Sequence, residues 1–503
     1  MKPAISLKLL LFLKPLLVAS LLLGCVPAEP PSQLSQIYQQ QQLRVGLLHS
    51  PTSYYIGIDG PAGFEYELST RLAEQLGVEL VVDPSFDLHE LKQKLQQGQV
   101  DYIAGGLTLT NARLAQYRAA PAYQWVNEQL VFRQGQPWPR SLDDIQQPVA
   151  VIAGSSHAET MQQLQRHYPH LEWQEFHDRD GDELLQMVVE DRIAYTLTDS
   201  NQLAINRRFF PNLSIAFTVQ EDRPIGWLLP KNQDDSLHSV LIEFFGDLYQ
   251  SGDLVTLEDR YFGHIRQFDY VDTLKFIEAI DQVLPNYQSL FQQYAGTLDW
   301  RLLAALSYQE SHWDPQARSV TGVRGMMMLT LPTARQMNVE NRLDAEESIA
   351  GGSRYLQHLL GRIPERIAMP DRLWFALAAY NIGLGHVEDA RILTQREGAD
   401  PDKWHEVKEH LPKLRQKRYY QRTRYGYARG DEAAHYVENI RRYFDTLQWV
   451  TDRQQIELRQ RKSNEATTDS SEDTPESHQA VAEPSEMPPE NNESGLSKTI
   501  RNL

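Results

Sequence analysis

The chain has 503 residues, which predicts two or three folded domains with additional tails, at roughly 100 to 200 residues per domain. Its 49 Lys and Arg residues against 67 Asp and Glu residues give a net charge of −18, which argues against nucleic-acid binding because most of the surface repels phosphate. A hydrophobic content of 41% is enough for real cores, while a mean hydropathy of −0.50 excludes a polytopic membrane protein.

Residues 1–25 have the features of an export signal. Three lysines precede the apolar run at 16–23, which is too short to span a bilayer but fits the hydrophobic region of a signal peptide. The run ends in Leu22-Leu23-Gly24-Cys25, which resembles the lipobox of bacterial lipoproteins and implies that Cys25 is lipidated. An ordinary cleavage site or an uncleaved anchor is the alternative. Because Cys25 is the only cysteine, an intrachain disulfide and a thiolate metal cluster are excluded.

A linker is expected at 26–39, and after it short strand-like runs alternate with amphipathic helices as far as residue 264. This alternation is typical of an α/β domain, which we place at 40–264. The strands are expected at 43–48, 77–82, 101–104, 149–152 and 194–198, and the helices at 65–76, 88–97, 158–167 and 181–190.

The strand signals stop near residue 264, and helical stripes continue to about residue 450. We therefore expect an all-α domain at 265–450, with helices including 273–283, 298–313, 349–360 and 373–381. The junction at 263–272 has no run of Gly, Ser or Pro, so the two domains are expected to touch.

The C-terminal tail, placed at 451–503, is strongly acidic. Its segment 463–496 carries nine acidic residues and no Lys or Arg, together with many Ser, Pro, Asn and Thr residues. Such a composition buries too little apolar area to offset the entropy of ordering the chain, so we expect the tail to be disordered.

Three segments of the α/β domain carry a family resemblance: GFEYEL at 63–68, GGLTLTNAR at 105–113 and AAPAY at 119–123. They resemble the family 3 solute-binding proteins, which capture amino acids in the bacterial periplasm, over residues 40–264. The resemblance implies a two-lobed α/β fold that binds a small ligand. A free amino acid and a peptide fragment of the cell wall would both suit such a site.

An amino-acid zwitterion needs a cation for its carboxylate and an anion for its ammonium group, both on preformed loops. The resemblance implies that Arg113 binds the carboxylate, that Asp199 binds the ammonium group, and that Thr108, Thr110 and Ser155 assist, the last by opening a helix whose free N–H groups favour anions. The alternatives are a solvated charge at Arg113, an ordinary N-cap at Asp199 and a simple turn at 154–156.

The most informative residue of the helical domain is Glu310. Pro315 disfavours helical geometry at the residue before it, so the helix should end near Trp313 and Glu310 should lie in its last turn. Counting back by three, four and seven residues gives Ser307, Leu306 and Leu303, so Glu310 projects from a mostly apolar face. Desolvation and the negative helix end both favour the protonated form, which predicts a general acid at neutral pH.

Three motifs then follow in order: Glu310-Ser311, GVRGMMMLT at 322–330 and AAYNIGLG at 378–385. Together they are similar to the catalytic domain of the soluble lytic transglycosylases, which are goose-type lysozyme-like enzymes. Joined to an amino-acid-binding-like domain, the arrangement resembles a membrane-bound lytic transglycosylase. In that family the glutamate protonates the glycosidic oxygen between N-acetylmuramic acid and N-acetylglucosamine, and then acts as base on the muramyl C6 hydroxyl to give a 1,6-anhydro product.

The resemblance also implies substrate-binding residues. Ser311, Tyr380 and Asn381 match positions that line the glycan groove, and Tyr436 follows the last family motif only loosely. At Met328 many relatives carry a glutamine, so a glycan contact there is in doubt because a thioether is a weak acceptor. The alternatives are a surface serine on the helix and a Tyr-Asn helix terminus before Gly383.

A second catalytic carboxylate, which an ordinary glycoside hydrolase needs, has no strong candidate. Asp314 is better explained as a helix-end residue, and Asp344, Glu346 and Glu347 look like solvated helix-start charges. For Glu310 itself, the alternative is a structural carboxylate paired with an arginine. The basic, aromatic stretch at 413–429 either contacts acidic wall peptides or is a solvated loop.

Together these features predict a cell-envelope enzyme that cleaves peptidoglycan strands without water and carries a domain that senses an amino acid or muropeptide. We expect it at the periplasmic face of the outer membrane, held by lipid or peripheral association. No motif suggests a metal or organic cofactor. A lysozyme-like hydrolase and a non-catalytic glycan or amino-acid receptor are the alternatives.

Overall fold

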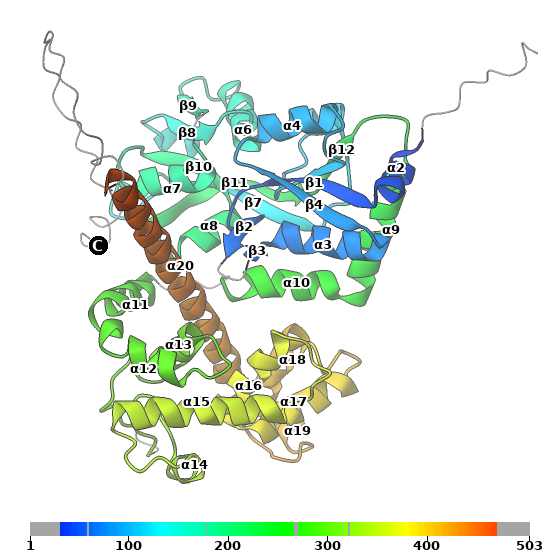
Figure 1. Cartoon of the computed structure of the whole chain (residues 1–503). Coiled ribbons are helices and arrows are strands. Elements are labelled where there is room, and N and C mark those ends of the chain that lie inside the picture. Colours follow the sequence, from blue (N-terminus) through cyan, green and yellow to red (C-terminus); the bar gives the residue numbers. More distant parts are fainter. Residues whose placement is uncertain (1–30, 58–59, 178, 266–269, 320–321, 470–503) are drawn as a thin grey trace, which may run out of the picture.

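The computed structural model describes residues 31–57, 60–177, 179–265, 270–319 and 322–469. An α/β domain is followed by a helical domain, and the long helix α20 (Gly430–Asp469) runs from the helical domain along the α/β domain (Figure 1). This is the expected fold class, a two-lobed α/β domain joined to a largely helical region. The predicted signal peptide with Cys25 lies outside the described residues.

The first lobe is built on a five-stranded sheet whose order is β4-β1-β5-β12-β6. Alternate residues of β1, namely Leu43, Val45 and Leu47, are fully buried because helices cover the sheet. The strands are β1 (Gln42–Leu48), β4 (Glu79–Ser85), β5 (Tyr102–Ala104), β6 (Tyr117–Ala119) and β12 (Leu228–Pro230), beside the hairpin of β2 (Tyr55–Gly57) and β3 (Gly60–Ala62); the helices are α2 (Gln33–Gln40), α3 (Phe64–Leu76), α4 (Leu88–Gln96), α5 (Asn111–Gln116), α9 (Ser236–Ser251) and α10 (Asp253–Phe262).

The second lobe has a sheet of order β11-β7-β10-β8-β9. The chain enters this lobe between β6 and β7 and leaves it between β11 and β12, so two short segments join the lobes. The strands are β7 (Gln124–Arg133), β8 (Val149–Ile152), β9 (Trp173–Phe176), β10 (Tyr195–Asp199) and β11 (Leu213–Ile225), and the helices are α6 (Ser156–Gln165), α7 (Gly181–Val189) and α8 (Ser200–Asn206), with a short 3-10 turn at Leu142–Asp144.

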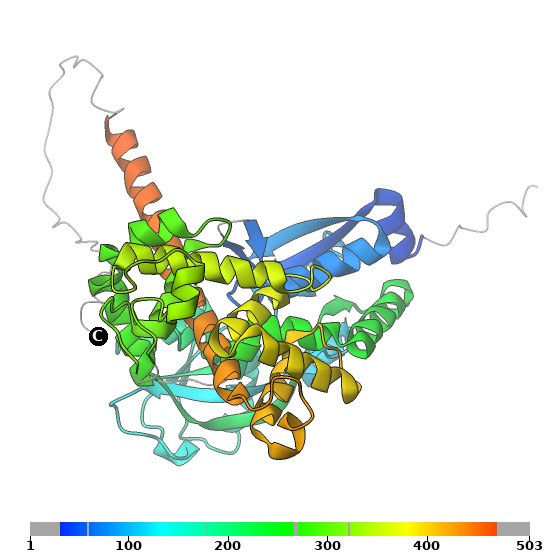
Figure 2. The ribbon, with the colours of Figure 1, turned by 90° about the horizontal axis from the view of Figure 1, so that it is seen from below.

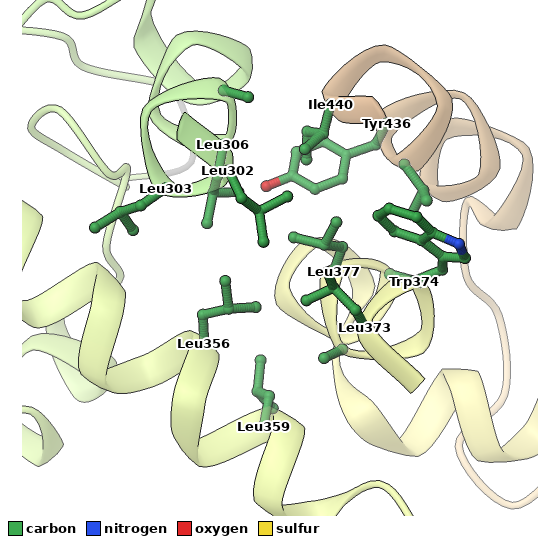
Figure 3. Close-up of a cluster of buried hydrophobic side chains, with 14 of the residues drawn as sticks. Leu302, Leu303, Leu306, Leu356, Leu359, Leu373, Trp374, Leu377, Tyr436 and Ile440 are labelled. Carbon is green, nitrogen blue, oxygen red and sulfur yellow. The ribbon is translucent and has the colours of Figure 1, made fainter. Parts of the chain in front are cut away.

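The helical domain encloses one apolar core, which α13, α15, α16 and α20 build together. Figure 3 shows Leu302 and Leu306 of α13, Leu356 of α15, Leu377 of α16 and Ile440 of α20 pointing into this core. The helices are α11 (Tyr270–Gln282), α12 (Gln288–Tyr294), α13 (Trp300–Ser311), α14 (Leu331–Gln336), α15 (Ala345–Arg362), α16 (Asp371–Ile382), α17 (Leu384–Arg396), α18 (Trp404–His410) and α19 (Lys417–Tyr420), with 3-10 turns at Gly263–Ile265, Leu284–Asn286 and Leu411–Arg415.

Gly325 shows why the loop before α14 needs glycine. Its φ is +81°, and a Cβ placed there would lie 1.6 Å from the carbonyl oxygen of Arg342. A side chain at this position is therefore excluded both by backbone conformation and by space. The close approach holds the loop against the segment that leads into α15.

The two domains contact each other through α20, as the short junction predicts. Asp445 accepts hydrogen bonds from Arg208 of the second lobe and from His264, which follows α10.

Further contacts between the domains involve α10 and the segment after α8. Lys408 of α18 and Arg441 of α20 both form ion pairs with Asp259 of α10. Trp449 and Phe209, which follows α8, stack with ring centroids 4.2 Å apart. Figure 2, seen from below, shows the last part of α20 (orange) extending beyond the rest of the fold.

Two expected boundaries differ from the structure. Helix α2 lies within the segment expected to be a linker. It packs on the first lobe, where its Ile37 side chain is only 1% exposed. Helix α20 continues to Asp469, so 451–469 is helical although the tail was expected to be disordered. Residues 470–503 lie outside the described residues.

Candidate active site

Glu310 lies in the last turn of α13, as predicted, and its helix face is apolar. Leu303, Leu306 and Ser307 on that face are completely buried, and Glu310 is half-buried. The helix ends immediately afterwards, because His312 and Trp313 take left-handed φ values of 53° and 61°. The Trp313 indole N–H donates to the carbonyl oxygen of Ala304 over 2.8 Å, which fixes this turn.

The carboxyl group of Glu310 contacts a tyrosine hydroxyl and no cation. Tyr436 of α20 donates a hydrogen bond to Oε1 of Glu310. Burial raises the pKa of Glu310 from 4.5 to about 7, although the bond from Tyr436 lowers it. Within the described part of the chain, no Lys, Arg or His forms an ion pair with Glu310, so an arginine-paired structural carboxylate does not explain it.

The other residues implied by the family motifs lie around the loop that precedes α14. Ser311 donates from Oγ to the carbonyl oxygen of Met326 over 2.8 Å, and the Tyr380 hydroxyl donates to that of Met327 over 2.9 Å. The Glu310 charge raises the pKa values of both Tyr380 and Tyr436, after burial, so both rings lie near it. The structure thus brings Glu310, Ser311, Tyr380 and Tyr436 together.

Met328 and Asn381 lie at the edge of this group. Met328 is half-buried and has a φ of 45°, a left-handed conformation that is unusual for a non-glycine residue. Asn381 is exposed in the last turn of α16. Neither side chain contacts Glu310 through a hydrogen bond in the described structure, so both stay predictions as glycan contacts.

The carboxylates considered as a second catalytic group have structural partners. Asp314 is exposed and accepts the N–H of Gln316 over 2.8 Å, as expected for a helix-end residue. Asp344 caps α15 by accepting the N–H of Glu347, and Glu347 in turn accepts two backbone N–H groups. These roles match the helix-start charges expected from the sequence.

Tyr436→Phe is expected to shift the pH dependence of activity. The hydroxyl of Tyr436 stabilises the ionised form of Glu310, so its removal raises the pKa of Glu310 further. The alkaline limb of the kcat/KM profile should therefore move to higher pH, while Tyr436→Phe retains the packing of the ring. Measured pH profiles of both proteins test this; an unmoved limb would show that Tyr436 does not act on Glu310.

In the α/β domain, a cleft of about 950 Å³ lies between the two lobes and contains most of the expected ligand residues. Thr108 and Arg113 line it from the first lobe, and Ser155 and Asp199 line it from the second. Thr110 does not line the cleft; its side chain instead caps α5 by accepting the N–H of Arg113. Ser155 caps α6, which places the start of that helix at the cleft.

Arg113 is not a solvated surface charge. It is 4% exposed, and its Nη1 donates to the carbonyl oxygen of Thr108 over 2.8 Å. Its Nε and the Thr108 hydroxyl have no hydrogen-bond partner among the described residues, although both are buried. Burial lowers the pKa of Arg113, so the guanidinium group favours an incoming anion.

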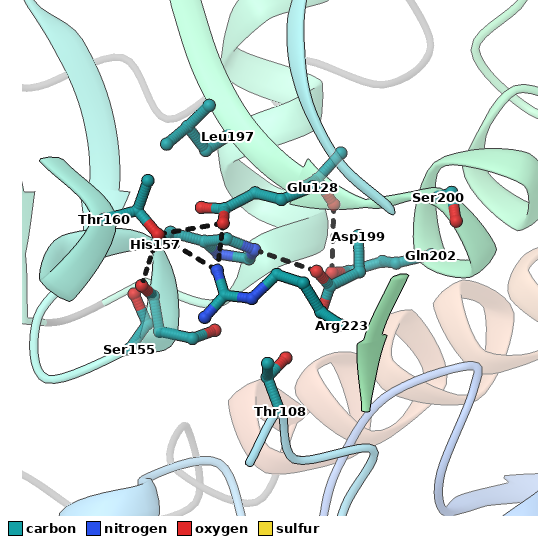
Figure 4. Close-up of polar contacts among 12 residues, drawn as sticks. Thr108, Glu128, Ser155, His157, Thr160, Leu197, Asp199, Ser200, Gln202 and Arg223 are labelled. Atoms are coloured by element: carbon teal, nitrogen blue, oxygen red, sulfur yellow. Dashed lines mark hydrogen bonds and ion pairs between the residues drawn. The ribbon is translucent and has the colours of Figure 1, made fainter. Parts of the chain in front are cut away.

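Asp199 does not act as an ordinary N-cap, because its side chain makes no bond to the start of α8. Instead, Oδ1 of Asp199 lies 3.4 Å from Nε2 of His157 (Figure 4). Beside this pair, Glu128 forms an ion pair with Arg223 and accepts a hydrogen bond from the hydroxyl of Thr160 over 2.9 Å. Although burial lowers the pKa of His157, Asp199 and Glu128 raise it above 6.5. The sequence reasoning missed His157, Glu128 and Arg223, since their pairing is visible only in three dimensions.

Two family models and several solved structures match parts of the chain. Residues 43–264 match the model for bacterial extracellular solute-binding proteins, family 3, and residues 289–402 match the transglycosylase SLT domain. A solved structure of an ancestral arginine-binding protein bound to arginine is 21% identical with a TM-score of 0.40, and the match covers 44% of this chain and 98% of that one.

Two curated relatives are similar over almost their whole length. Membrane-bound lytic murein transglycosylase F of Idiomarina loihiensis is 51% identical over 89% of this chain and 98% of the relative. The protein of the same name from Pseudoalteromonas translucida is 52% identical over 87% of this chain and 93% of the relative. The chain therefore belongs to the membrane-bound lytic murein transglycosylase F family.

Proposed function

We propose that this lytic murein transglycosylase cleaves the β-1,4 bond between N-acetylmuramic acid and N-acetylglucosamine, with Glu310 as its single acid and base. The observation that carries the proposal is a half-buried carboxyl group at the end of α13 with a pKa of about 7, bonded to Tyr436 and to no cation of the described chain. Such a group is partly protonated at neutral pH and can both donate and accept a proton.

The reaction proceeds in two steps that consume no water. Neutral Glu310 donates its proton to the glycosidic oxygen, and the bond between that oxygen and muramyl C1 breaks, which leaves positive charge at C1 and a carboxylate at Glu310. The carboxylate then takes the proton of the muramyl C6 hydroxyl as O6 forms a bond to C1. The product has a 1,6-anhydro end, and Glu310 is protonated again for the next cycle.

A single carboxylate suffices for this route because the substrate supplies its own nucleophile. A hydrolase would need a second carboxylate to activate water or to bind C1. Asp314, the nearest such residue in sequence, holds a backbone N–H in an exposed turn. Ser311, Met328, Tyr380, Asn381 and Tyr436 are the residues that we expect to line the glycan site.

The mass of the products tests the proposal. Digestion of purified sacculi should yield muropeptides that are each one water lighter than the products of a lysozyme. Products with the same mass as those of a lysozyme would show that the enzyme is a hydrolase instead. The absence of any cleavage would instead support a glycan-binding receptor.

For the α/β domain, we propose that the cleft binds an amino acid or a muropeptide and that binding changes activity. The buried Arg113 with its unpartnered Nε suits a carboxylate, and Asp199 suits an ammonium group. Helix α20 supports coupling between the cleft and the glycan site, because it carries Tyr436, which contacts Glu310. The same helix carries Asp445, which accepts hydrogen bonds from Arg208 of the second lobe and from His264 after α10. Turnover that is indifferent to amino acids and wall-derived peptides would leave the domain a docking module.

For localisation, we propose attachment to the outer membrane on its periplasmic side through a lipid on Cys25. The support is the run Leu22-Leu23-Gly24-Cys25 and the words membrane-bound in the names of the relatives. Within the described residues, no helix is both long and apolar enough to cross a bilayer.

A further inference from the structure

The segment 413–429, here called the basic hairpin, has a charge opposite to that of the whole protein. It contains seven cationic side chains and no acidic one, in a chain whose net charge is −18. It lies between the 3-10 turn Leu411–Arg415 and the start of α20, and it includes α19. The cations are Lys413, Arg415, Lys417, Arg418, Arg422, Arg424 and Arg429.

Three of these cations already have carboxylate partners at the ends of the hairpin. Lys413 pairs with Glu397, Arg415 with Asp431 and Arg429 with Glu432. The four at its centre are exposed and have no carboxylate partner within the described residues: Lys417, Arg418, Arg422 and Arg424. A local excess of positive charge is therefore available to a ligand.

The backbone of the basic hairpin is fixed in place. Asp389 of α17, which is 1% exposed, accepts the N–H groups of Arg424 and Tyr425 over 3.0 and 2.8 Å. Ala428 donates to the carbonyl oxygen of Leu414 over 3.2 Å, which closes the loop. A buried carboxylate that holds two backbone N–H groups stabilises one loop conformation, so the cations are presented in a defined array.

Aromatic rings support the cations. The guanidinium of Arg418 lies 4.8 Å from the Tyr419 ring centre, and that of Arg424 lies 5.4 Å from the Tyr425 ring centre. Tyr425 and Tyr427 are each 52% exposed. Nε and Nη2 of Arg418 also donate to Oε1 of Gln416 over 3.2 and 3.1 Å, so a ring and an amide together hold this guanidinium group in place.

The basic hairpin also packs against α17, the helix that follows the one carrying Tyr380 and Asn381. The Tyr425 ring covers Gly385, where a Cβ would lie 2.7 Å from the ring. Gly385 is only four residues from Asn381, in the same family motif as Tyr380. On its other side the hairpin leads directly into α20, which carries Tyr436. A glycan strand bound at Glu310 would therefore pass close to the hairpin.

We propose that the basic hairpin binds the free carboxylates of the peptide stems that peptidoglycan strands carry. The inference rests on the proposed function, because it places those stems beside the glycan site. An anionic membrane surface is the other chemistry that attracts such a cluster. The fixed backbone and the closeness to Gly385 favour the stems.

The test combines Lys417→Gln, Arg418→Gln and Arg422→Gln in one protein. Its matched control combines Arg166→Gln, Lys275→Gln and Arg362→Gln, which remove the same charge from exposed positions elsewhere. Each protein is assayed on strands with intact stems and on strands from which an amidase has removed the peptides. We expect the hairpin variant to lose about tenfold in kcat/KM on intact strands, and to match the control on stripped strands.

The loss should also shrink as salt is raised, because exposed charge pairs are screened. An equal loss on both substrates, or no loss on either, would overturn the proposal. Sedimentation with vesicles that contain anionic lipid tests the membrane alternative. If the hairpin variant lost vesicle binding but cleaved intact and stripped strands like the control, the hairpin would be a membrane-binding surface. Hydrolysed products from the wild type would overturn the proposed function. The difference between intact and stripped strands could still be measured, so failure of the proposed function and failure of the stem-binding proposal are distinguishable.

Discussion

Glu310→Gln is expected to reduce cleavage of sacculi by about 10³-fold or more, since general acid catalysis alone contributes roughly 10² to 10⁴ and the same group also serves as base. Glutamine has the same shape, and its amide oxygen can accept the hydrogen bond that Tyr436 donates to Glu310. The release of soluble muropeptides measures the effect. Cleavage at the wild-type rate would remove Glu310 from the chemistry.

A stability measurement provides the control for this variant. Because the pKa of Glu310 in the folded protein, about 7, lies above 4.5, the folded state binds this proton more tightly than the unfolded chain. The resulting stabilisation is complete below pH 4.5 and is lost as the pH rises through 7. At pH 8 the buried, ionised carboxylate therefore lowers the free energy of unfolding by up to about 3 kcal/mol, and a neutral glutamine avoids this loss. Glu310→Gln should therefore melt at or above the wild-type temperature at pH 8, which separates lost chemistry from lost folding.

Arg113→Gln is expected to abolish ligand binding in the cleft of the α/β domain. The side chain is 4% exposed and its Nε is unpartnered in the described structure, so a ligand carboxylate is expected to fill that place. Hydrogen bonds to charged groups contribute about 1.5 to 3 kcal/mol each, so losing a bidentate pair should weaken binding by at least 10²-fold. Calorimetric titration with a panel of amino acids and wall-derived peptides measures this.

Arg166→Gln provides the comparison for that experiment, because Arg166 is exposed at the end of α6 and does not line the cleft. It should bind each compound as the wild type does. Equal affinity of Arg113→Gln and wild type for a compound that both bind would show that the guanidinium group does not hold the ligand carboxylate.

The position of Glu310 could be predicted because its signal is local. Helical spacing places it on the apolar face with Leu306 and Leu303, and Pro315 marks the helix end. Strands β1, β4 and β5 of the first lobe were also predictable, since each has its own hydrophobic pattern, and so were helices α3, α4, α6, α7, α11, α13, α15 and α16. The fold class followed from the order of these patterns.

The long strands β7 and β11 were not predicted, although they form the largest part of the second sheet. Strand β11 contains Gln220, Glu221 and Asp222, which look like a turn, and it pairs with β7 through three register shifts. A paired strand of this kind is stabilised by its partner rather than by its own alternation.

The partners of the site residues could not be predicted for a different reason. Tyr436 is 126 residues from Glu310, and Asp445 is 237 residues from Arg208, so only the fold brings them together. The helix at 451–469 has a local signal of its own, since 451–462 is rich in strong helix formers, and the acidic composition farther along the chain does not cancel it.

The ¹³C NMR titration of the Glu310 side-chain carboxyl carbon tests the central claim most directly. The signal is assigned by its absence from the spectrum of Glu310→Gln. The account predicts a midpoint near pH 7, because burial on the apolar face of α13 disfavours the charged form. A midpoint near 4.5 would show an ordinary hydrated carboxylate, which could not hold the proton that the proposed cleavage requires.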